Sequence, residues 1–448
     1  MKKENKTTNT NQTMKTNLLT NIKVGRVTRC APSQCIYQPT GAHRVTRPTA
    51  LGAREGALHV GGLPLLLPLA LAVALTLLTH TAFAQTWQTV DDFQYAADRS
   101  AQAWALAKDP LGNIYVAGIG NDVAGDHALV MKSSDGGSTW STLPVDDFTG
   151  VGNGAWYSGI TSDSAGSLFA AGGYADESAG TYHWLVRRSQ DVGITWQTID
   201  DVTGESTTAI ATDGTGNIYV AGYGSGYWIV RKGTPDSSSP VGMSWQTVDT
   251  YAGAVARSVF CHPTAGVFAV GGANPWTVRR SQNGGSSWTT VDTFVPKNAT
   301  YALANGICAD LSGNLYVVGR YQLNTTHAYR WLTRKSTNGG NSWTTVDDFL
   351  PKGAGSSAIA NGVGVDASGN VFVVGRARGQ GFTSSDWCVR LSAAGTGAWL
   401  TVDAFQYFPQ TYGSSEALAV VGDASGHVLV TGYGTDANNV QHWLVRKN

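Results

Sequence analysis

The chain has 448 residues, of which 42% are hydrophobic and only 14% charged, and it is rich in glycine (55) and tryptophan (15). This composition favours many short strands joined by tight turns over helices. The formal net charge is zero, but residues 85–448 carry 21 basic and 29 acidic side chains. The acidic excess argues against a nucleic-acid partner, whose phosphates need a basic face.

The first 84 residues have the pattern of an export leader. Residues 1–60 are basic and rich in Asn and Thr, which predicts a disordered leader or a start site placed too far upstream. An uncharged apolar stretch, Leu63–Leu78, is followed by Ala82-Phe83-Ala84, so 61–84 is expected to be a signal peptide cleaved near Ala84. A retained anchor is the alternative, although sixteen residues are short for a span of about 20. We therefore expect a monomer that is secreted, periplasmic or at the cell surface, with no membrane span in the mature chain.

One short motif recurs seven times: a Trp, then polar residues, an aliphatic residue and an Asp. Its copies begin at Trp87, Trp140, Trp196, Trp245, Trp288, Trp343 and Trp399. Successive copies are 43 to 56 residues apart, a period typical of propellers and solenoids.

Three further strand-like segments precede this motif in each repeat. Segment A ends at a turn of the form Asp-x-x-Gly-Asn, as at 109–113, in which Asp binds the backbone and Gly takes the left-handed conformation. Segment B is a β-branched and aromatic run that ends at Gly, such as Ile114–Gly118. Segment C resembles Trp184–Arg188, and the Trp motif itself is segment D. Each repeat is therefore predicted to form four strands and no helix.

Segment A has a small residue at one fixed position and a large aliphatic residue directly after it. The small residues are Ala105, Gly159, Ala209, Ser258, Gly306, Gly362 and Ala419. Adjacent strand residues face opposite sides of a sheet, so every copy has one flat face, as sheets stacked around an axis require. The last repeat ends after segment C, and an extra segment D, 87–93, precedes the first. The sequence predicts an all-β, seven-bladed β-propeller of four-stranded antiparallel blades spanning 85–448, closed by strand 87–93 completing the last blade.

A second signature, Ser-x-Asp/Asn-x-Gly-x-Ser/Thr-Trp, joins segments C and D in four repeats. Its residues are Ser133, Asp135, Gly137 and Trp140; Ser189, Asp191, Gly193 and Trp196; Ser281, Asn283, Gly285 and Trp288; and Ser336, Asn338, Gly340 and Trp343. It resembles the Asp-box, or bacterial neuraminidase repeat, of sialidase-like propellers, and the Asp-x-x-Gly-Asn segments look like the bacterial β-propeller repeat. The resemblance covers 87–448 and implies a structural hairpin turn away from the ligand face. It does not imply a metal site, because the turn lacks the several oxygen ligands of a calcium loop.

No constellation of residues commits the chain to catalysis. The sialidase resemblance would imply an Arg-Ile-Pro segment, which is absent, and three arginines that clamp a substrate carboxylate. The arginines of segment C recur at one repeat position, so we expect each to pair with the segment D aspartate of its own blade, as Arg187 with Asp200, for about 0.2–1 kcal/mol. His127, His183 and His442 also share one repeat position, on blades expected to lie far apart, and the scattered cysteines fit no zinc pattern. No metal and no cofactor is expected.

Ligand binding is expected where the repeats differ, in the D–A and B–C connections at one end of the ring. The candidate residues are Trp104, Trp156, Tyr157, Arg257, Asn305, Asn361, Glu177 and Glu416. Aromatic rings beside amides and carboxylates suit a sugar or a protein hot spot, whereas packing between blades is the alternative for each aromatic. We expect a non-catalytic binding or scaffold propeller whose partner is a polysaccharide or an exported protein. A sialidase-like glycoside hydrolase that uses loop carboxylates and an envelope assembly factor are the alternatives.

Overall fold

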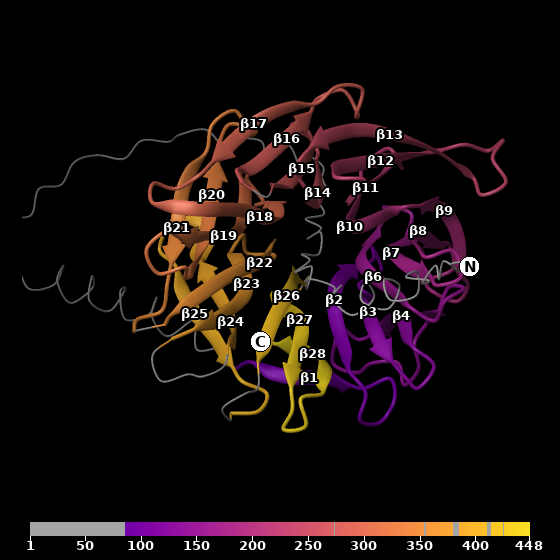
Figure 1. Ribbon diagram of the computed structural model, residues 1–448, viewed down its shortest axis with the longest axis horizontal. Coiled ribbons are helices and arrows are strands. Elements are labelled where there is room, and N and C mark those ends of the chain that lie inside the picture. Colours follow the sequence, from indigo (N-terminus) through magenta and orange to yellow (C-terminus); the bar gives the residue numbers. More distant parts are fainter. Residues whose placement is uncertain (1–85, 273, 354, 380–384, 410–413, 424) are drawn as a thin grey trace, which may run out of the picture.

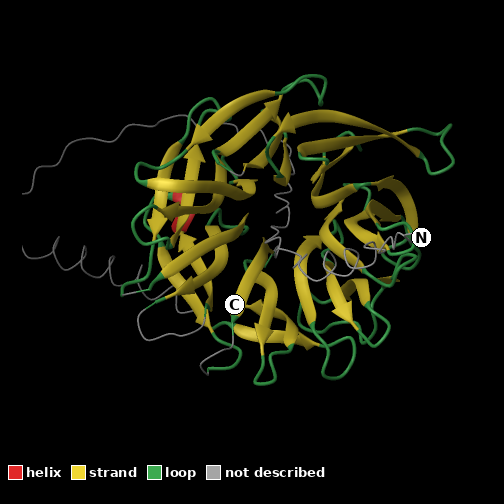
Figure 2. Ribbon diagram, viewed as in Figure 1, coloured by secondary structure: helices red, strands yellow, loops and turns green. Residues whose placement is uncertain are grey.

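The computed structural model describes residues 86–448 except 273, 354, 380–384, 410–413 and 424. The leader and signal peptide predicted for 1–60 and 61–84 lie outside the described residues. Seven four-stranded antiparallel sheets stand around a common axis (Figure 1). Strands form nearly all of the regular structure (Figure 2), and the described helical structure is one short 3-10 turn, Ala393–Gly395. The predicted seven-bladed propeller is thereby confirmed.

Each blade runs from an innermost to an outermost strand. Blade 1 is β2 (Ala101–Lys108), β3 (Ile114–Asn121), β4 (Asp126–Ser133) and β5 (Asp146–Phe148); blade 2 is β6 (Ala155–Ser162), β7 (Leu168–Asp176), β8 (Thr181–Ser189) and β9 (Gln197–Thr203); blade 3 is β10 (Glu205–Thr212), β11 (Ile218–Gly224), β12 (Tyr227–Pro235) and β13 (Met243–Ala252). Blade 4 is β14 (Ala256–His262), β15 (Gly266–Gly272), β16 (Trp276–Ser281) and β17 (Thr289–Phe294); blade 5 is β18 (Ala299–Ala309), β19 (Leu315–Leu323), β20 (Tyr329–Ser336) and β21 (Thr344–Phe349). Blade 6 is β22 (Ser357–Val365), β23 (Val371–Arg378), β24 (Asp386–Ser392) and β25 (Leu400–Phe405); blade 7 is β26 (Ser415–Gly422), β27 (Val428–Thr435), β28 (Gln441–Lys447) and β1 (Gln88–Phe93).

The ring is closed by its first strand, as predicted. β1 pairs antiparallel with β28, so that Asp91 lies opposite Val445 and Phe93 opposite Trp443. In every other blade the outermost strand follows the third strand directly in the chain, whereas blade 7 takes its outermost strand from the other end of the propeller. Closure leaves no sheet without its fourth strand and so removes an exposed edge.

The core lies between the blades. Six tryptophans at the start of the third strand are completely buried: Trp184, Trp228, Trp276, Trp331, Trp387 and Trp443. The small residues of the innermost strands allow neighbouring blades to approach closely, since a Cβ on Gly159 would lie 3.2 Å from Ile210 of the next blade. One flat and one bulky face per strand thus produce the stacking that the alternation predicted.

Ion pairs join neighbouring blades, and here the expected pairing is wrong. Arg187 does not bind Asp200 of its own blade; its Nε and Nη2 donate to both carboxylate oxygens of Asp146, on the preceding blade, at 3.0 Å. The reason is a register shift in the β8–β9 pairing, which places Asp200 opposite Val186 and Arg187 opposite Thr198. Successive strand residues face opposite sides, so Arg187 and Asp200 point to different neighbouring blades.

The same bidentate pair recurs at six of the seven blade junctions. The pairs are Arg187–Asp146, Arg231–Asp200, Arg279–Asp249, Arg334–Asp292, Arg390–Asp347 and Arg446–Asp403. Their N–O distances are 2.7–3.0 Å, and their side chains are mostly buried. Such planar two-point contacts hold the blades in register.

The Asp-box signatures form compact turns between the third and fourth strands. Oγ of Ser189 accepts the Gly193 N–H at 2.9 Å, and Asp191 accepts the Thr195 N–H at 2.8 Å and its hydroxyl at 2.6 Å. Asn283 and Asn338 replace the aspartate in blades 4 and 5 and accept the equivalent backbone N–H at 2.9 Å. Within the described part of the chain these carboxylates and amides therefore organise their own turns.

No helix among the described residues has the length and apolar character needed to cross a membrane.

Candidate ligand-binding face

The innermost strand of every blade carries a β-bulge at one place. In each innermost strand the register with the second strand shifts directly after one paired residue. These paired residues are Ala103, Tyr157, Thr207, Ala256, Ala304, Ala360 and Ala417. The seven bulge residues are Trp104, Ser158, Thr208, Arg257, Asn305, Asn361 and Leu418. Bulges re-aim a side chain and are common beside functional sites. The structure thus brings Trp104, Arg257, Asn305 and Asn361 of the predicted site to one level of the ring.

Several bulge residues tie neighbouring blades together. Asn305 donates from Nδ2 to the carbonyl of Ala360 at 2.7 Å, and Asn361 donates to the carbonyl of Ala417 at 2.9 Å. Both asparagines are fully buried, and neither Oδ1 has a hydrogen-bond partner among the described residues. The two amides therefore brace blades 5, 6 and 7 near the axis.

Glu416 lies at the centre of a polar cluster on blades 6 and 7. It is 4% exposed, accepts from Asn361 at Oε1 (2.9 Å) and from the Tyr433 hydroxyl at Oε2 (2.8 Å), and lies 3.6 Å from Nε of Arg376. The attraction of Glu416 raises the pKa of Arg376 above its ordinary value. Both oxygens of the carboxylate thus already accept hydrogen bonds.

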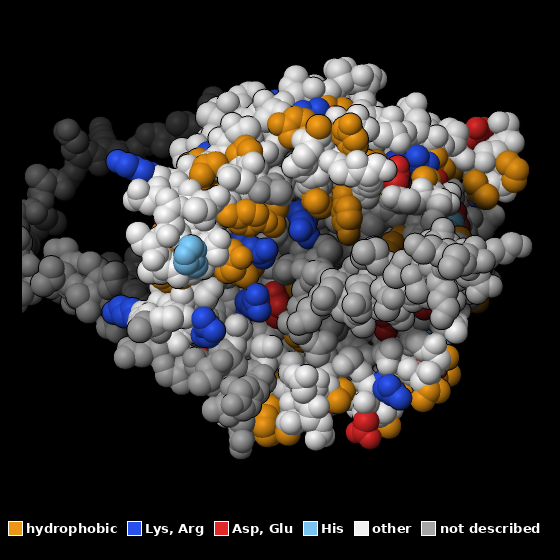
Figure 3. Space-filling model, in the orientation of Figure 1, with side chains coloured by type: hydrophobic (Ala, Val, Ile, Leu, Met, Phe, Trp, Pro, Cys, Tyr) orange, Lys and Arg blue, Asp and Glu red, His pale blue; other side chains and the backbone are white. Residues whose placement is uncertain are grey.

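Arginines from three consecutive blades belong to this region. Arg257 is the bulge residue of β14, while Arg320 and Arg376 each follow the glycine of their second strand and pair with Leu303 and Ile359. The Arg320 guanidinium stacks on Tyr329, 5.0 Å from the ring centre, and its buried Nε has no hydrogen-bond partner among the described residues. Lys and Arg side chains gather around the centre of this face over β14, β18 and β22 (Figure 3).

Sequence reasoning missed Arg320 and Arg376. The signal was present, because the residue after the second-strand glycine varies among the blades while its neighbours repeat. It is Ile119, Gly173, Tyr223, Gly272, Arg320, Arg376 or Tyr433 in blades 1 to 7. Variation at a fixed position of a repeat is the pattern expected of a binding surface.

The remaining predicted site residues are placed apart from this cluster. Tyr157 is completely buried, and its hydroxyl donates to Asp146 between blades 1 and 2. Trp156 packs edge-on against Tyr182, which is 51% exposed, with ring centres 6.2 Å apart. Glu177 is exposed in the β7–β8 loop, and so it does not join Glu416 on the innermost strand of blade 7.

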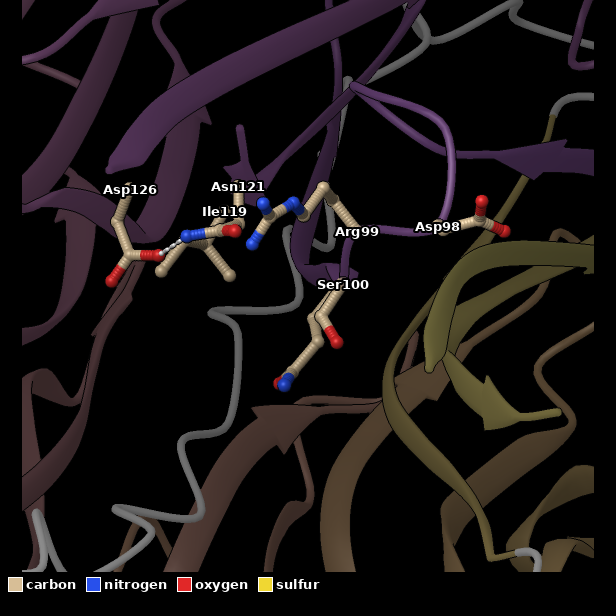
Figure 4. A pocket seen from close by; sticks show the side chains of 7 residues that line it. Asp98, Arg99, Ser100, Ile119, Asn121 and Asp126 are labelled. Carbon is tan, nitrogen blue, oxygen red and sulfur yellow. Dashed lines mark hydrogen bonds between the residues drawn. The ribbon is translucent and has the colours of Figure 1, made fainter. Parts of the chain in front are cut away.

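A polar cavity of about 420 Å³ opens on blade 1, and its lining does not include Arg257, Arg320 or Arg376. Its lining residues are Asp98, Arg99, Ser100, Gln102, Ile119, Asn121 and Asp126. Figure 4 shows the Arg99 side chain directed toward Asn121, whose amide donates to Asp126 at 2.9 Å. Gln102 also accepts a hydrogen bond from Trp104 at 2.7 Å, so the predicted Trp104 contacts a residue that lines this cavity.

The three repeated histidines lie on blades 7, 1 and 2, which are consecutive, so the expectation that they are far apart is wrong. Each donates from Nδ1 to the fourth-strand aspartate of its own blade: His127 to Asp147 at 2.7 Å, His183 to Asp201 at 2.6 Å and His442 to Asp92 at 2.8 Å. A tyrosine stacks on each ring, with centres 4.4–4.6 Å apart. The part of the chain that the structure describes holds no group of three or more His, Cys, Asp or Glu side chains arranged for a metal.

Comparison with known proteins shows the fold and not the activity. No sequence family and no curated protein matches the chain. Among solved structures, YCF48 bound to D1 peptide is 14% identical, covers 81% of this chain and 96% of its own, and has a TM-score of 0.51. A GH74 xyloglucanase from Xanthomonas campestris is 15% identical over 80% of this chain and 55% of its own, with a TM-score of 0.49. An α-L-arabinofuranosidase of Fusarium graminearum is 12% identical over 80% of this chain and 97% of its own, with a TM-score of 0.45. These neighbours include both glycoside hydrolases and a protein bound to a peptide.

Proposed function

We propose that this protein is an exported, non-catalytic binding propeller that recognises an acidic polysaccharide on the face formed by the D–A and B–C connections. The observation that carries the proposal is the set of three arginines, Arg257, Arg320 and Arg376, on consecutive blades near the axis. A guanidinium binds a carboxylate by two parallel hydrogen bonds. Glu416 offsets one of the three positive charges through its contact with Arg376 at 3.6 Å, so the cluster keeps an excess of positive charge for a ligand.

A binding role is favoured over hydrolysis by the positions and hydrogen bonds of the glutamate carboxylates. A glycoside hydrolase needs two carboxyl groups about 5–10 Å apart, one on each side of the bond to be cleaved. Glu416 is bound on both oxygens, and Glu177 lies in an exposed loop of another blade. The four Asp-box turns support kinship with the Asp-box propellers, and the predicted signal peptide at 61–84 supports export.

One observation favours a glycoside hydrolase as the second candidate. Glu205, at the start of β10, is partly buried; burial raises the pKa of its carboxyl group, and its Oε2 has no hydrogen-bond partner among the described residues. A raised pKa is what a general acid requires. Glu205 and Glu416 lie on blades 3 and 7, which are not neighbours in the ring.

The test is a calorimetric titration of the purified full chain with polygalacturonate, using its methyl ester as the uncharged control. We expect binding of the acid form only, and a loss of about tenfold or more in Arg320→Ala, since a hydrogen bond to a charged group contributes about 1.5–3 kcal/mol. Arg188→Ala is the matched control, because Arg188 lies on β8 and donates to the Val241 carbonyl in the outer part of the ring. Equal affinity for the acid and the ester would refute the proposal, and release of reducing ends that Glu205→Gln abolishes would establish the hydrolase instead.

A further inference from the structure

The seventh blade junction, between blade 7 and blade 1, lacks the ion pair found at the other six. Asp91 on β1 lies opposite Val445, as Asp200 lies opposite Val186, so it occupies the aspartate position of the repeat. On β4 of blade 1, Met131 follows Val130, as Arg187 follows Val186. A methionine that is 1% exposed therefore stands where each other blade supplies an arginine.

Asp91 is consequently a partly buried acid without a counter-charge. Its Oδ2 is buried and has no hydrogen-bond partner among the described residues. Burial, together with the neighbouring charge of Asp92, raises the pKa of Asp91 from 3.8 to about 7. An unpaired carboxylate in such a site strongly disfavours its ionised form.

The charged groups on the adjoining strands are engaged elsewhere. Asp92 binds His442 and Tyr407, and Arg446 of β28 binds Asp403 on the opposite side of its sheet. Lys132, next to Met131 on β4, donates to the carbonyl of Val192. Lys108 of β2 donates to the carbonyl of Gly422, and Lys447 of β28 donates to that of Gly136. These last two contacts cross the same junction and do not involve a group that ionises near neutral pH.

The covalent connectivity makes this junction the place where the ring can open. β1 is held in blade 7 by its pairing with β28 and by side-chain contacts such as those of Asp92. No turn of the chain joins β1 to β28, because the two strands come from opposite ends of the propeller. In the other blades the fourth strand is joined to the third by a continuous turn. Release of β1 would expose the edge of β28 without breaking any other blade.

We propose that this junction is a proton-operated latch: protonation of Asp91 closes the ring firmly, and its ionisation weakens the blade 7–blade 1 contact so that β1 is the first strand to be released. The direction follows from linkage. A folded-state pKa above the unfolded value means that the closed ring binds the proton more tightly, so the stabilisation is complete below about pH 4 and is lost as the pH rises through about 7. The opening constant of β1 is the equilibrium constant for its release from blade 7. Between pH 4 and 7 this constant rises by at most about tenfold per pH unit.

Hydrogen exchange of the full chain between pH 5 and 8, corrected for the intrinsic exchange rate, tests the latch. The opening constant of β1 is expected to rise severalfold per pH unit between pH 5 and 7. The reference is β17, the equivalent strand of blade 4, where Asp292 is bound by Arg334; its opening constant is expected to change less than twofold. Asp91→Asn, which has nearly the same shape and cannot ionise, should make the opening of β1 clearly less dependent on pH than in the wild-type protein, with the His442–Asp92 contact unchanged.

Met131→Arg supplies the missing partner and should reverse the trend, so that β1 becomes better protected as Asp91 ionises. If that larger side chain prevents folding, the wild-type and Asp91→Asn proteins decide the question by themselves. Exchange of β1 that varies equally with pH in these two proteins would overturn the proposal, as would β1 exchange no more pH-dependent than that of β17.

Discussion

The identity of the arginine that binds Asp200 decides whether the Arg–Asp ion pairs join neighbouring blades or lie within one blade. Asp200 accepts from Nε and Nη2 of Arg231, on the next blade, at 2.8 Å. Arg187, on its own blade, binds Asp146 instead. A double-mutant cycle with Asp200→Asn and Arg231→Met measures the first contact, and the same cycle with Arg187→Met measures the second. Methionine is chosen because Met131 already occupies this position at the seventh junction.

The size of the expected coupling follows from burial. The side chains of Arg231 and Asp200 are 13% and 6% exposed, and burial raises the pKa of Asp200 even though Arg231 opposes the change. Removing one partner leaves the other charge buried, at a cost of about 3–5 kcal/mol. Because the double mutant avoids part of that cost, we expect a coupling free energy of about 2–3 kcal/mol for Arg231 and Asp200. For Arg187 and Asp200 we expect less than about 0.5 kcal/mol.

Guanidinium unfolding followed by tryptophan fluorescence measures these free energies, since Trp184 and Trp228 are fully buried in blades 2 and 3. The slopes of the transitions must agree among the variants for the cycle to be valid. A coupling between Arg187 and Asp200 that equals or exceeds the coupling between Arg231 and Asp200 would refute the assignment of these pairs to the junctions between blades.

Three further predictions concern turns and packing. Asp191→Ala should lower the melting temperature more than Asp191→Asn, since asparagine occupies this position in blades 4 and 5. Hydrogen bonds from Thr195 lower the pKa of Asp191 to about 2. Thermal melts should therefore show the stabilisation by Asp191 above pH 4, and this stabilisation should be lost as the pH falls through 2. Gly222→Ala should destabilise the fold by about 3 kcal/mol or more in denaturant titrations, because the new Cβ would lie 2.1 Å from the Ser206 carbonyl oxygen. Gly214→Ala is the control: its new Cβ would have no atom within 4 Å, so this variant should be neutral or slightly stabilising. Tyr157→Phe should cost about 1–3 kcal/mol by the same measurement, because it removes a buried donor to Asp146.

The sequence by itself determined the number of blades, the four strands in each and the way in which the ring closes. These features depend on patterns that are local in the chain. Alternation places the small residues such as Gly159 on one face, turn chemistry ends strands at residues such as Asp109, and the repeat period counts the blades. The position of 87–93 before the first repeat was sufficient to predict the pairing of β1 with β28.

The tertiary structure alone decided which side chains meet. Each bulge changes the face to which the following residues point, and no repeat motif marks it. For that reason Arg187 binds the preceding blade, and Arg257 gathers near the axis with Arg320 and Arg376 although it comes from a different position in its repeat. Met131 looked unremarkable in the sequence, because an aliphatic side chain suits any buried strand. That Met131 replaces the arginine expected opposite Asp91 becomes visible only when blade 1 is placed beside β1, because the closing junction joins residues from opposite ends of the propeller.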